Sequence, residues 1–271
     1  MPSYVITGAS RGIGWELLRQ LSSDSSNTII GIVRNKSATQ EKMKEELPER
    51  TNIHIVEADI TGYTALKAAA TETATITGGG LDYLIANAGL VPTFDAYDPI
   101  GVLGQQPEAL EENLIKCFKI NTVSNIHLFN LFMPLILKGE VKKVIAISSG
   151  HASLDAISNL GIEVAPLYTI SKAALNAAVA KFSAQYAKDG VLFMSICPGM
   201  VDTGHFANAT EEQLKGLAGM LGAFARYAPN FKGPSPPETA VQDVISVMEK
   251  ASAKGGDGGS FVSHYGNQQW L

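Results

Sequence analysis

Short apolar runs that alternate with helical patterns are the feature of this 271-residue chain that most constrains its fold. The runs are nearly continuous in Ile, Val and Leu, which is typical of strands buried on both faces of a parallel sheet. Strands are expected at 4–7, 28–33, 53–57, 83–86, 141–148, 191–197 and 260–262, and helices at 12–22, 38–47, 63–76, 107–137, 166–188 and 236–253. The pattern predicts an α/β protein with a doubly wound, Rossmann-type parallel sheet of about seven strands in one domain, 1–271, which binds ligands at the carboxyl ends of the strands.

Two segments do not fit this alternation. Residues 150–166 form a longer loop than a strand-to-helix connection needs. Residues 203–235 carry a helical pattern with larger apolar side chains on roughly one face, namely Leu214, Leu217, Met220, Leu221 and Phe224. Because this segment follows a strand end and leaves through a Gly/Pro-rich stretch at 233–237, we predict a lid over the substrate; a surface helix packed on the core is the alternative.

Composition narrows the class of protein. The net charge is −5, which argues against a nucleic-acid surface driven by bulk charge. The cysteines, Cys117 and Cys197, are interpreted as small buried residues and not as a disulfide or a metal pair, so no metal is expected. The sequence contains no long apolar run or signal-peptide pattern, and we expect a cytoplasmic protein without a membrane span.

A glycine-rich turn follows the first expected strand. Residues 7–14 read Thr-Gly-Ala-Ser-Arg-Gly-Ile-Gly and open the first expected helix. Glycine permits a tight turn and close backbone approach to a pyrophosphate, while the helix N-terminus offers amides and a favourable dipole. A dinucleotide site is therefore predicted, with cofactor-binding residues Gly8, Ser10, Arg11, Gly12, Ile13 and Gly14.

The end of the second strand indicates which dinucleotide is bound. A site that prefers NAD places Asp or Glu about 20 residues past the glycines, on the ribose 2′-hydroxyl. This chain has Arg34 there, and a guanidinium attracts a 2′-phosphate. Arg11 adds a second positive charge, although either arginine could be a solvated surface residue. We predict NADPH as the cofactor.

Tyr168 and Lys172 are four residues apart, on one face of an expected helix. A nearby ammonium stabilises a phenolate and makes the tyrosine competent in proton transfer to a carbonyl that accepts hydride. Ser149 follows a strand end, where its hydroxyl could hold the substrate oxygen. Such a pair can arise by chance, and serines are common in turns. The ordered set of glycine turn, serine, tyrosine and lysine nevertheless indicates an oxidoreductase.

With these motifs the chain resembles the classical short-chain dehydrogenases/reductases over essentially its whole length. The resemblance rests on the glycine turn 7–14 and on Asp59, Asn87-Ala88-Gly89, Asn121, Ser149, Tyr168, Lys172 and the run 198–203, Pro-Gly-Met-Val-Asp-Thr. It implies that Asn121, Ser149, Tyr168 and Lys172 are catalytic. Asn121 would hold a water that links Lys172 to solvent.

The resemblance also implies further contacts with the cofactor. Asp59 and Ile60 would lie at the adenine, and Asn87, Ala88 and Gly89 would support the sheet and the cofactor. Lys172 would bind the nicotinamide ribose beside Tyr168. The nicotinamide side would be met by Pro198, Gly199, Val201 and Thr203.

Within the family the chain looks most like carbonyl reductases related to sniffer and to norsolorinic acid ketoreductase, on its C-terminal residues 259–261 and 266–270. The gap from Ser149 to Tyr168 is longer than the commonest family spacing, so Ser148 and Ser153 stay open as alternatives for the active serine. His151, in this gap, is interpreted as a pocket-wall or surface residue without a proton role.

The function expected is an NADPH-dependent ketoreductase for a bulky, largely apolar carbonyl, in fungal secondary metabolism. The apolar lid stripe and the aromatic Phe206, Phe224 and Tyr227 motivate this size, although they could equally be core residues. An NADP-dependent alcohol dehydrogenase and a non-catalytic NADPH-sensing regulator are the alternatives. The resemblance implies a homodimer or homotetramer built on the two long helices, where Ala173, Ala174, Ala177, Ala178 and Ala180 permit close approach.

Overall fold

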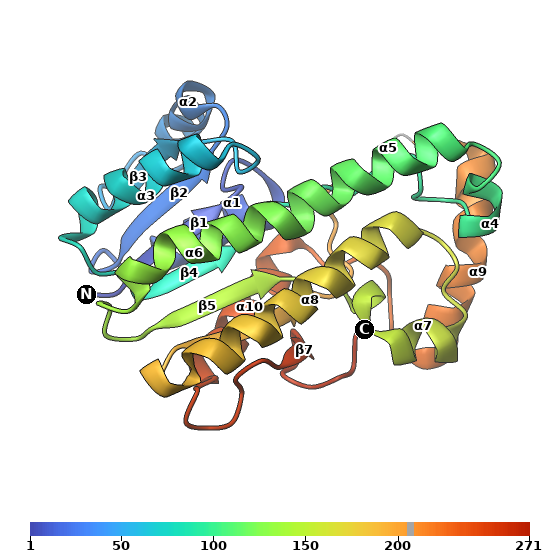
Figure 1. Ribbon diagram of the computed structural model, residues 1–271. Coiled ribbons are helices and arrows are strands. Elements are labelled where there is room, and N and C mark those ends of the chain that lie inside the picture. Colours follow the sequence, from blue (N-terminus) through green and yellow to red (C-terminus); the bar gives the residue numbers. More distant parts are fainter. Residues whose placement is uncertain (205–208) are drawn as a thin grey trace.

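A seven-stranded, all-parallel sheet forms the centre of the structure, a computed structural model that describes residues 1–204 and 209–271 (Figure 1). The strands lie in the order β3-β2-β1-β4-β5-β6-β7. Their bounds are β1 Ser3–Thr7, β2 Thr28–Val33, β3 Ile53–Glu57, β4 Tyr83–Ala86, β5 Lys143–Ile147, β6 Leu192–Cys197 and β7 Phe261–Ser263. The predicted fold class is confirmed, and the predicted strands agree with these bounds to within two residues.

The strand order reverses at β1. From β1 the chain first winds outward to β2 and β3, and then returns to the other side of β1 for β4 to β7. A crevice for ligands lies outside the carboxyl ends of the strands at such a switch point, because the connections leave it in opposite directions. In this chain the glycine turn after β1 and the loop after β4 meet there.

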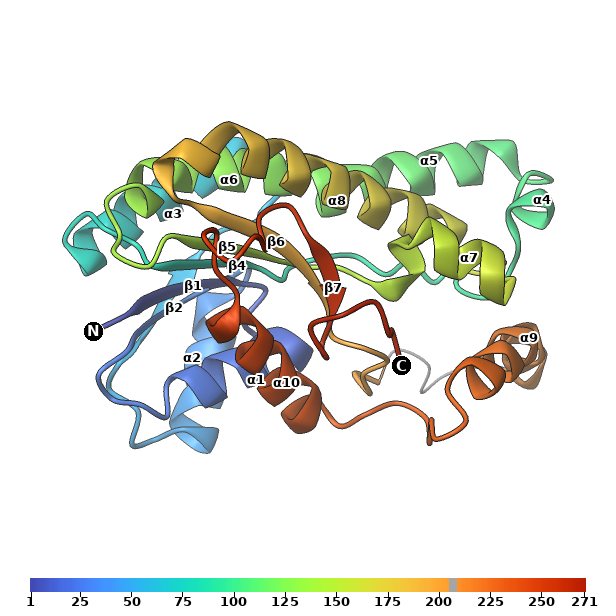
Figure 2. The same cartoon turned by 90° about the horizontal axis from the view of Figure 1, so that it is seen from below.

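Helices cover both faces of the sheet (Figure 2). One face carries α1 Gly12–Leu21, α2 Lys36–Glu46 and α10 Pro237–Lys250; the other carries α3 Tyr63–Thr77, α6 Ser124–Ile136 and α8 Pro166–Tyr186. Each face has its own cluster of buried apolar residues, so every central strand is buried on both sides. This burial is why the strands read as continuous apolar runs.

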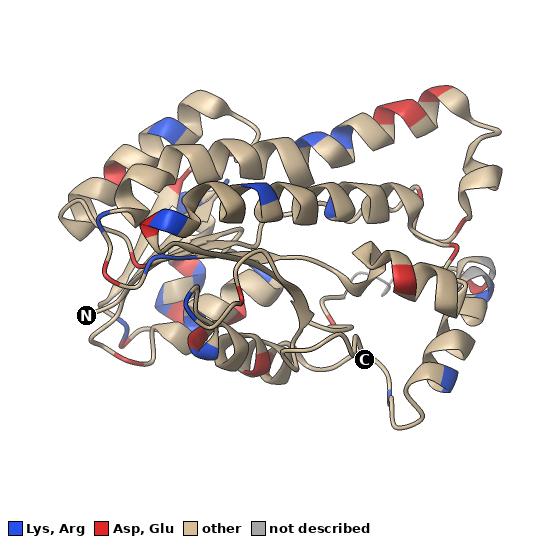
Figure 3. Cartoon of the chain, turned by 60° about the horizontal axis from the view of Figure 1, so that its bottom comes forward, with Lys and Arg blue, Asp and Glu red and all other residues tan. Residues whose placement is uncertain are grey.

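The long helix expected at 107–137 is interrupted in its middle. It consists of α5 Pro107–Phe118, a π-helical turn at Lys119–Val123, and α6. Charges on α5 follow the helix dipole, with Glu108, Glu111 and Glu112 near its start and Lys116 near its end (Figure 3). π-Helical turns are frequent at functional sites, and this one contains Asn121.

The loop expected at 150–166 is not a plain loop. It contains the 3₁₀ turn η2 Gly150–Ala152 and the helix α7 Leu154–Leu160. Ser153 begins α7 by accepting a hydrogen bond from Ala156 N, and Gly161 ends it in the left-handed conformation. No clear signal for α7 is visible in the sequence, because a helix of two turns shows little periodicity.

The expected helix in 203–235 is present as α9 Glu211–Tyr227, and Thr210 and Gln213 form a reciprocal capping box at its start. The base of this segment is fixed, because Val201 and Ser235 form a parallel bridge and Asp202 N donates to Ser235 O at 2.9 Å. The remaining short elements are α4 Ile100–Leu103 and η3 Ala187–Asp189. Over the described ranges, none of the helices combines the length and apolarity that a bilayer crossing requires.

Candidate active site

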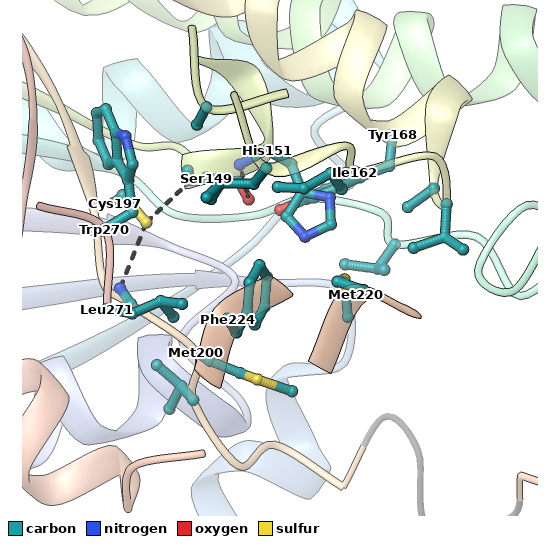
Figure 4. A pocket seen from close by; sticks show the side chains of 18 of the residues that line it. Ser149, His151, Ile162, Tyr168, Cys197, Met200, Met220, Phe224, Trp270 and Leu271 are labelled. Carbon is teal, nitrogen blue, oxygen red and sulfur yellow. Dashed lines mark hydrogen bonds between the residues drawn. The ribbon is translucent and has the colours of Figure 1, made fainter. Parts of the chain in front are cut away.

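A cavity of about 190 Å³ lies beyond the carboxyl ends of β5 and β6 (Figure 4). Its walls come from the loop after β5, from α7, α8 and α9, and from the C-terminal residues. Most lining side chains are apolar, among them Val91, Leu160, Ile162, Val164, Met200, Leu217, Met220, Phe224 and Trp270. The polar side chains on this wall include Ser149, His151, Tyr168 and Thr203. The cavity therefore combines an apolar body with a few hydrogen-bonding groups, which is typical of a small-molecule site.

Tyr168 and Lys172 come from the first turns of α8, and Ser149 from the end of β5. Ser149 and Tyr168 both line the cavity. Lys172 is 4% exposed; its Nζ lies 5.9 Å from the centroid of the Tyr168 ring and donates to Ile147 O at 2.7 Å. The structure thus brings together three of the four residues that are predicted to be catalytic; the fourth, Asn121, is described below.

Burial dominates the ionisation of this group. It raises the pKa of Tyr168 above its ordinary value, and the hydrogen bond with the Ser149 side chain acts in the opposite direction. Burial also lowers the pKa of Lys172 to about 8, against the opposing charge effects of Cys117 and Cys197. The ammonium was expected to lower the pKa of Tyr168; desolvation is the larger effect here, so the phenol keeps its proton at neutral pH.

Among the three candidate serines, geometry favours Ser149. The side chain of Ser148 is buried outside the cavity lining, and the hydroxyl of Ser153 is used to cap α7. The Ser149 Oγ accepts a hydrogen bond from His151 N at 3.3 Å. This contact uses a lone pair of the Ser149 oxygen and not its proton, so the proton is available for a hydrogen bond to a substrate oxygen or to Tyr168.

Asn121 is buried behind this group. Its Oδ1 accepts from Leu90 N at 2.7 Å, and its Nδ2 donates to Leu90 O at 2.9 Å and to Ser171 Oγ at 2.9 Å. The backbone oxygen of Asn121 accepts from Asn125 Nδ2 at 2.8 Å. Asn121 therefore ties the π-helical turn to the loop after β4 and to α8, next to Lys172; its expected role in holding a water stays a prediction.

The glycine turn fits an anionic diphosphate. Gly8 has a φ of +70°, and a Cβ on Gly14 would overlap the carbonyl oxygen of Gly8, so α1 approaches the turn closely only because position 14 is glycine. Arg11, the residue before α1, makes no capping hydrogen bond with its side chain. The first amides and the dipole of α1 are thus directed at the place where a pyrophosphate binds in such folds. Ser10 and Arg11 are exposed at the same turn, beside Gly12 and Ile13.

A basic loop follows β2. Arg34 is exposed, and its charge is one of the causes that lower the pKa of Asp59, after the hydrogen bonds from Thr61. Lys36, which the sequence analysis did not single out, is the first residue of α2, directly after this loop. Its backbone N donates to Glu57 Oε2 at 2.9 Å, and its side chain pairs with Glu72 at 3.7 Å. Arg34 and Asp59 therefore lie near each other, as expected for residues around one ribose and adenine, with Ile60 half-buried beside them.

The remaining predicted cofactor residues surround the same crevice. Asn87 Nδ2 donates to Thr7 O at 2.9 Å, and the Thr7 hydroxyl accepts from the amides of Asn87 and Ala88, which fastens the ends of β1 and β4 together. A Cβ on Gly89 would lie 3.1 Å from Asn121 Oδ1, so the loop after β4 also runs close to the catalytic group.

The loop after β6 crosses to the glycine turn from the other side. The Thr203 methyl group lies 3.5 Å from where a Cβ of Gly12 would be. Pro198 is buried, Val201 is half-buried, and a Cβ on Gly199 would lie only 2.8 Å from His264 Cε1. The structure thus brings the predicted cofactor residues after β1, β4 and β6 to one place.

The sequence did not indicate Asp95, a carboxylate that is 0% exposed. Its Oδ2 accepts from Leu167 N at 2.7 Å and from Tyr168 N at 3.0 Å, and its backbone oxygen accepts from Ala165 N at 2.8 Å. Since Ala165 has no capping side chain, a residue far along the chain caps α8 next to Tyr168, the predicted catalytic tyrosine. No local pattern could have revealed this cap.

Cys197 was expected to be a buried, unpaired thiol, and it is one. Its Sγ accepts from Gly150 N at 3.0 Å and from Gly199 N at 3.4 Å (dashed in Figure 4). Burial raises the pKa of this thiol to about 11. Cys197 thus holds together the loops that follow β5 and β6. Cys117 is likewise buried and unpaired.

The apolar stripe of α9 is divided. Leu217, Met220 and Phe224 line the cavity, whereas Leu214 and Leu221 are 49% and 40% exposed, so only part of the predicted apolar face lies against the cavity. Tyr227 is not a cavity residue: its hydroxyl donates to Gln268 O at 3.2 Å and accepts from Trp270 N at 3.3 Å, which joins α9 to the C-terminal segment. Phe206 lies outside the described residues.

Comparisons with known proteins identify the family of the chain. The family model described as short chain dehydrogenase matches residues 3–214. The chain is 62% identical over 271 residues to the short chain dehydrogenase virK of Hypocrea virens, and the match covers 100% of both chains.

Two solved structures share the fold at 23% identity and a TM-score of 0.77, with 98% of each chain covered. They are the carbonyl reductase Sniffer of D. melanogaster and the NADPH-bound carbonyl reductase from chicken fatty liver. Because the family model and the virK match extend over the glycine turn and the fungal relative matches throughout, the chain belongs to the short-chain dehydrogenases/reductases.

Proposed function

We propose that the protein is an NADPH-dependent ketoreductase that reduces a bulky, largely apolar carbonyl compound in fungal secondary metabolism. The observation that carries this proposal is that Tyr168 and Ser149 together line a largely apolar cavity, where burial raises the pKa of the Tyr168 hydroxyl. A group that donates a proton is needed when a carbonyl oxygen gains charge, and the apolar walls accommodate the body of such a substrate.

The residues of the glycine turn and of the loops after β4 and β6 would hold the cofactor, and its nicotinamide would supply the hydride when bound. Ser149 orients the carbonyl oxygen through its available proton, and the contact strengthens as negative charge develops. Tyr168 then transfers its phenolic proton to that oxygen. Lys172, whose Nζ donates to Ile147 O, would stabilise the resulting phenolate and, as the family resemblance implies, bind the nicotinamide ribose. The apolar walls, with Met220 and Phe224, exclude water from the reacting atoms.

The preference for NADPH rests on charge at the end of β2. Arg34 and Lys36 follow this strand, where an acidic side chain would select the unphosphorylated ribose. Arg11 faces solvent at the glycine turn. A fold relative, the carbonyl reductase from chicken fatty liver, is an NADPH-bound enzyme, which agrees with this preference.

Kinetics with both cofactors test the proposal. The unmodified protein is expected to reduce aromatic ketones with kcat/KM at least tenfold higher for NADPH than for NADH, because charge-assisted contacts with the 2′-phosphate contribute about 1.5–3 kcal/mol. Arg34→Asp is expected to remove this preference, while Arg50→Asp, in the loop before β3, is the matched surface control. Equal efficiency with both cofactors in the unmodified protein would contradict the NADPH preference, and no reduction of any ketone would contradict the reductase.

We further propose a homodimer or homotetramer that associates through α5 and α8. These helices pack side by side, and their outer surface exposes Ile115, Phe118 and Ile170. Ala177 and Ala180 are exposed on α8 as well, where small side chains allow a second helix to come close. Burial of these apolar residues favours association of two copies.

A further inference from the structure

His151 is a polar residue of the cavity that the proposed proton transfer does not use. It follows Ser149 by two residues in η2, and Figure 4 shows its imidazole projecting into the cavity. The surrounding wall is apolar, with Ile162, Met220 and Phe224 among its residues. An imidazole in such a wall requires an explanation, because a phenylalanine or a leucine would fill similar space without polar atoms.

The imidazole has unused hydrogen-bonding capacity. Within the described part of the chain, its Nδ1 is buried and has no hydrogen-bond partner. Burial lowers the pKa of His151 to about 4, so the ring is neutral at pH 7. A neutral imidazole offers one donor and one acceptor, and leaving either of them unpaired in an apolar environment costs free energy. A polar group on the substrate would remove this cost.

The position of the ring restricts where that group lies. The centroids of the His151 and Tyr168 rings are 6.5 Å apart, with an angle of 65° between their planes. A substrate whose carbonyl meets Tyr168 therefore presents its nearest neighbouring atoms to His151. The group is a neutral one, since a carboxylate buried against a neutral imidazole and apolar walls would lack compensating charge.

We propose that His151 determines substrate specificity by hydrogen bonding to a hydroxyl or a second carbonyl oxygen, on the same ring system as the carbonyl that is reduced. This inference rests on the proposed ketoreductase function and narrows its substrate class to oxygenated, uncharged, largely apolar ketones. The backbone amide of His151 donates a hydrogen bond to Ser149 Oγ, and its side chain contacts the substrate. The turn η2 thus positions a residue for the reduction and also contributes to substrate specificity.

The test compares ligands that differ in one hydroxyl group. α-Tetralone and its four monohydroxy isomers on the aromatic ring are titrated into the protein in the presence of NADP⁺, with fluorescence of the cavity residue Trp270 as the readout. At least one hydroxy isomer is expected to bind about 3- to 10-fold more tightly than α-tetralone, the range for one hydrogen bond between neutral groups. In His151→Phe and His151→Leu this ratio is expected to fall to about 1.

Two further variants separate recognition from packing. His151→Gln keeps a donor and an acceptor and is expected to retain part of the ratio. Met220→Leu changes the opposite wall and is expected to alter the affinities of all five ligands alike. Because Met220 is apolar, the hydroxy-to-parent ratio then stays as in the unmodified protein. Affinity for NADPH verifies that each variant is folded.

The inference is overturned if no hydroxy isomer binds more tightly than α-tetralone, which includes the case that none of the ligands binds, or if His151→Phe and His151→Leu preserve the ratio. Reduction of the same ligands by NADPH is measured separately. Binding that depends on His151 without any reduction would contradict the ketoreductase and leave the inference standing. Reduction of these ligands, with a hydroxy-to-parent affinity ratio that does not change when His151 is replaced, would contradict the inference and leave the ketoreductase standing.

Discussion

At the scale of single residues, the reactivity of the candidate site follows from burial. Burial raises the pKa of Tyr168, so the phenol keeps its proton at neutral pH. Burial lowers the pKa of Lys172 to about 8, which is close to neutral pH. The two groups are close enough to interact, with Lys172 Nζ 5.9 Å from the Tyr168 ring centroid. Tyr168 can therefore donate its proton when negative charge develops on the substrate oxygen, with the Lys172 ammonium close by to stabilise the phenolate.

Removal of the Tyr168 hydroxyl tests its role as the proton donor. Tyr168→Phe is expected to lower kcat by about 10² to 10⁴, the usual contribution of a general acid. The affinity for NADPH, measured by cofactor fluorescence, is expected to stay within a few fold, because the ring remains in place. Turnover of the preferred ketone at a near-normal rate would show that the proton comes from another group.

The lowered pKa of Lys172 predicts a pH dependence of cofactor binding. Below about pH 8 the folded protein carries the ammonium, and above it the amine is neutral, so the affinity for NADPH is expected to weaken as the pH rises through about 8. Lys172→Met is expected to bind more weakly and without this inflection.

The control for that experiment is Lys143→Met. Burial lowers the pKa of Lys143 as well, but its Nζ donates to Met248 O and Glu249 O, far from the cavity. The inflection is expected to persist in this variant. Its disappearance there, or its persistence in Lys172→Met, would contradict the role of Lys172.

Asp95 positions Tyr168 by capping α8. Asp95→Ala leaves the buried amides of Leu167 and Tyr168 without this acceptor, so the free energy of unfolding in urea is expected to fall by about 1–3 kcal/mol. A reduction in kcat is expected in addition, because the tyrosine loses its fixed place, and Asp95→Asn, which keeps one oxygen acceptor, is expected to restore part of both.

Asp257→Ala provides a comparison for Asp95. The Asp257 carboxylate accepts from Ser252 N at 2.7 Å in the loop between α10 and β7, away from the cavity. It is expected to reduce stability without a change in kcat. If Asp95→Ala also leaves kcat unchanged, Asp95 is a structural cap and does not position the tyrosine.

At the scale of elements, α9 is the part of the molecule best placed to move over a substrate. Leu217, Met220 and Phe224 form its inner side, and the Val201–Ser235 bridge fixes the base of the segment. Among the residues that the structure describes, Tyr227 adds polar contacts between α9 and the C-terminal residues, and the inner side of α9 packs against Ile162 and Val164. We propose that a helix attached in this way closes over the substrate as a lid.

Hydrogen exchange tests this lid. Amides of α9 are expected to exchange at least several-fold more slowly when NADP⁺ and a ketone are both bound, because a closed lid opens less often. The buried helix α10, with Val241 and Val244 in the core, serves as the internal reference and is expected to stay unchanged. If exchange slows in the cavity loops but does not slow in α9, then α9 is a static wall of the cavity and not a lid.

At the scale of the whole molecule, the outer surface of α5 and α8 leaves apolar side chains without cover. Phe118 is 39% and Ile115 59% exposed. Charged substitution, as in Ile115→Glu with Phe118→Glu, is expected to convert the oligomer to monomer in multi-angle light scattering, because two carboxylates would be desolvated at the interface. Leu154→Glu, also at an exposed apolar position but on α7, is the control. A monomeric unmodified protein would contradict the proposed assembly.

The order of the strands and helices, and the functional residues where the strands end, could be predicted from local sequence patterns. Continuous apolar runs identified the parallel strands, and the four-residue spacing placed Tyr168 and Lys172 on one helix face, because both signals are local and periodic. The glycine turn was recognisable for the same reason. A Cβ at position 14 would overlap the Gly8 carbonyl oxygen, so this close approach requires a glycine, and that glycine is seen in the sequence. Because the family motifs follow several different strands, they also predicted that the ligand crevice lies at the carboxyl ends of these strands.

The residues that line the cavity, and the pKa shifts of its titratable groups, became known from the folded structure and not from the sequence. The Asp95 cap of α8, the division of the α9 stripe, and the place of His151 beside Tyr168 depend on contacts between residues distant in sequence, for which a local pattern carries no information. The raised pKa of Tyr168 and the lowered pKa of Lys172 come from desolvation. Desolvation depends on everything packed around a group, so it exists only once the chain has folded.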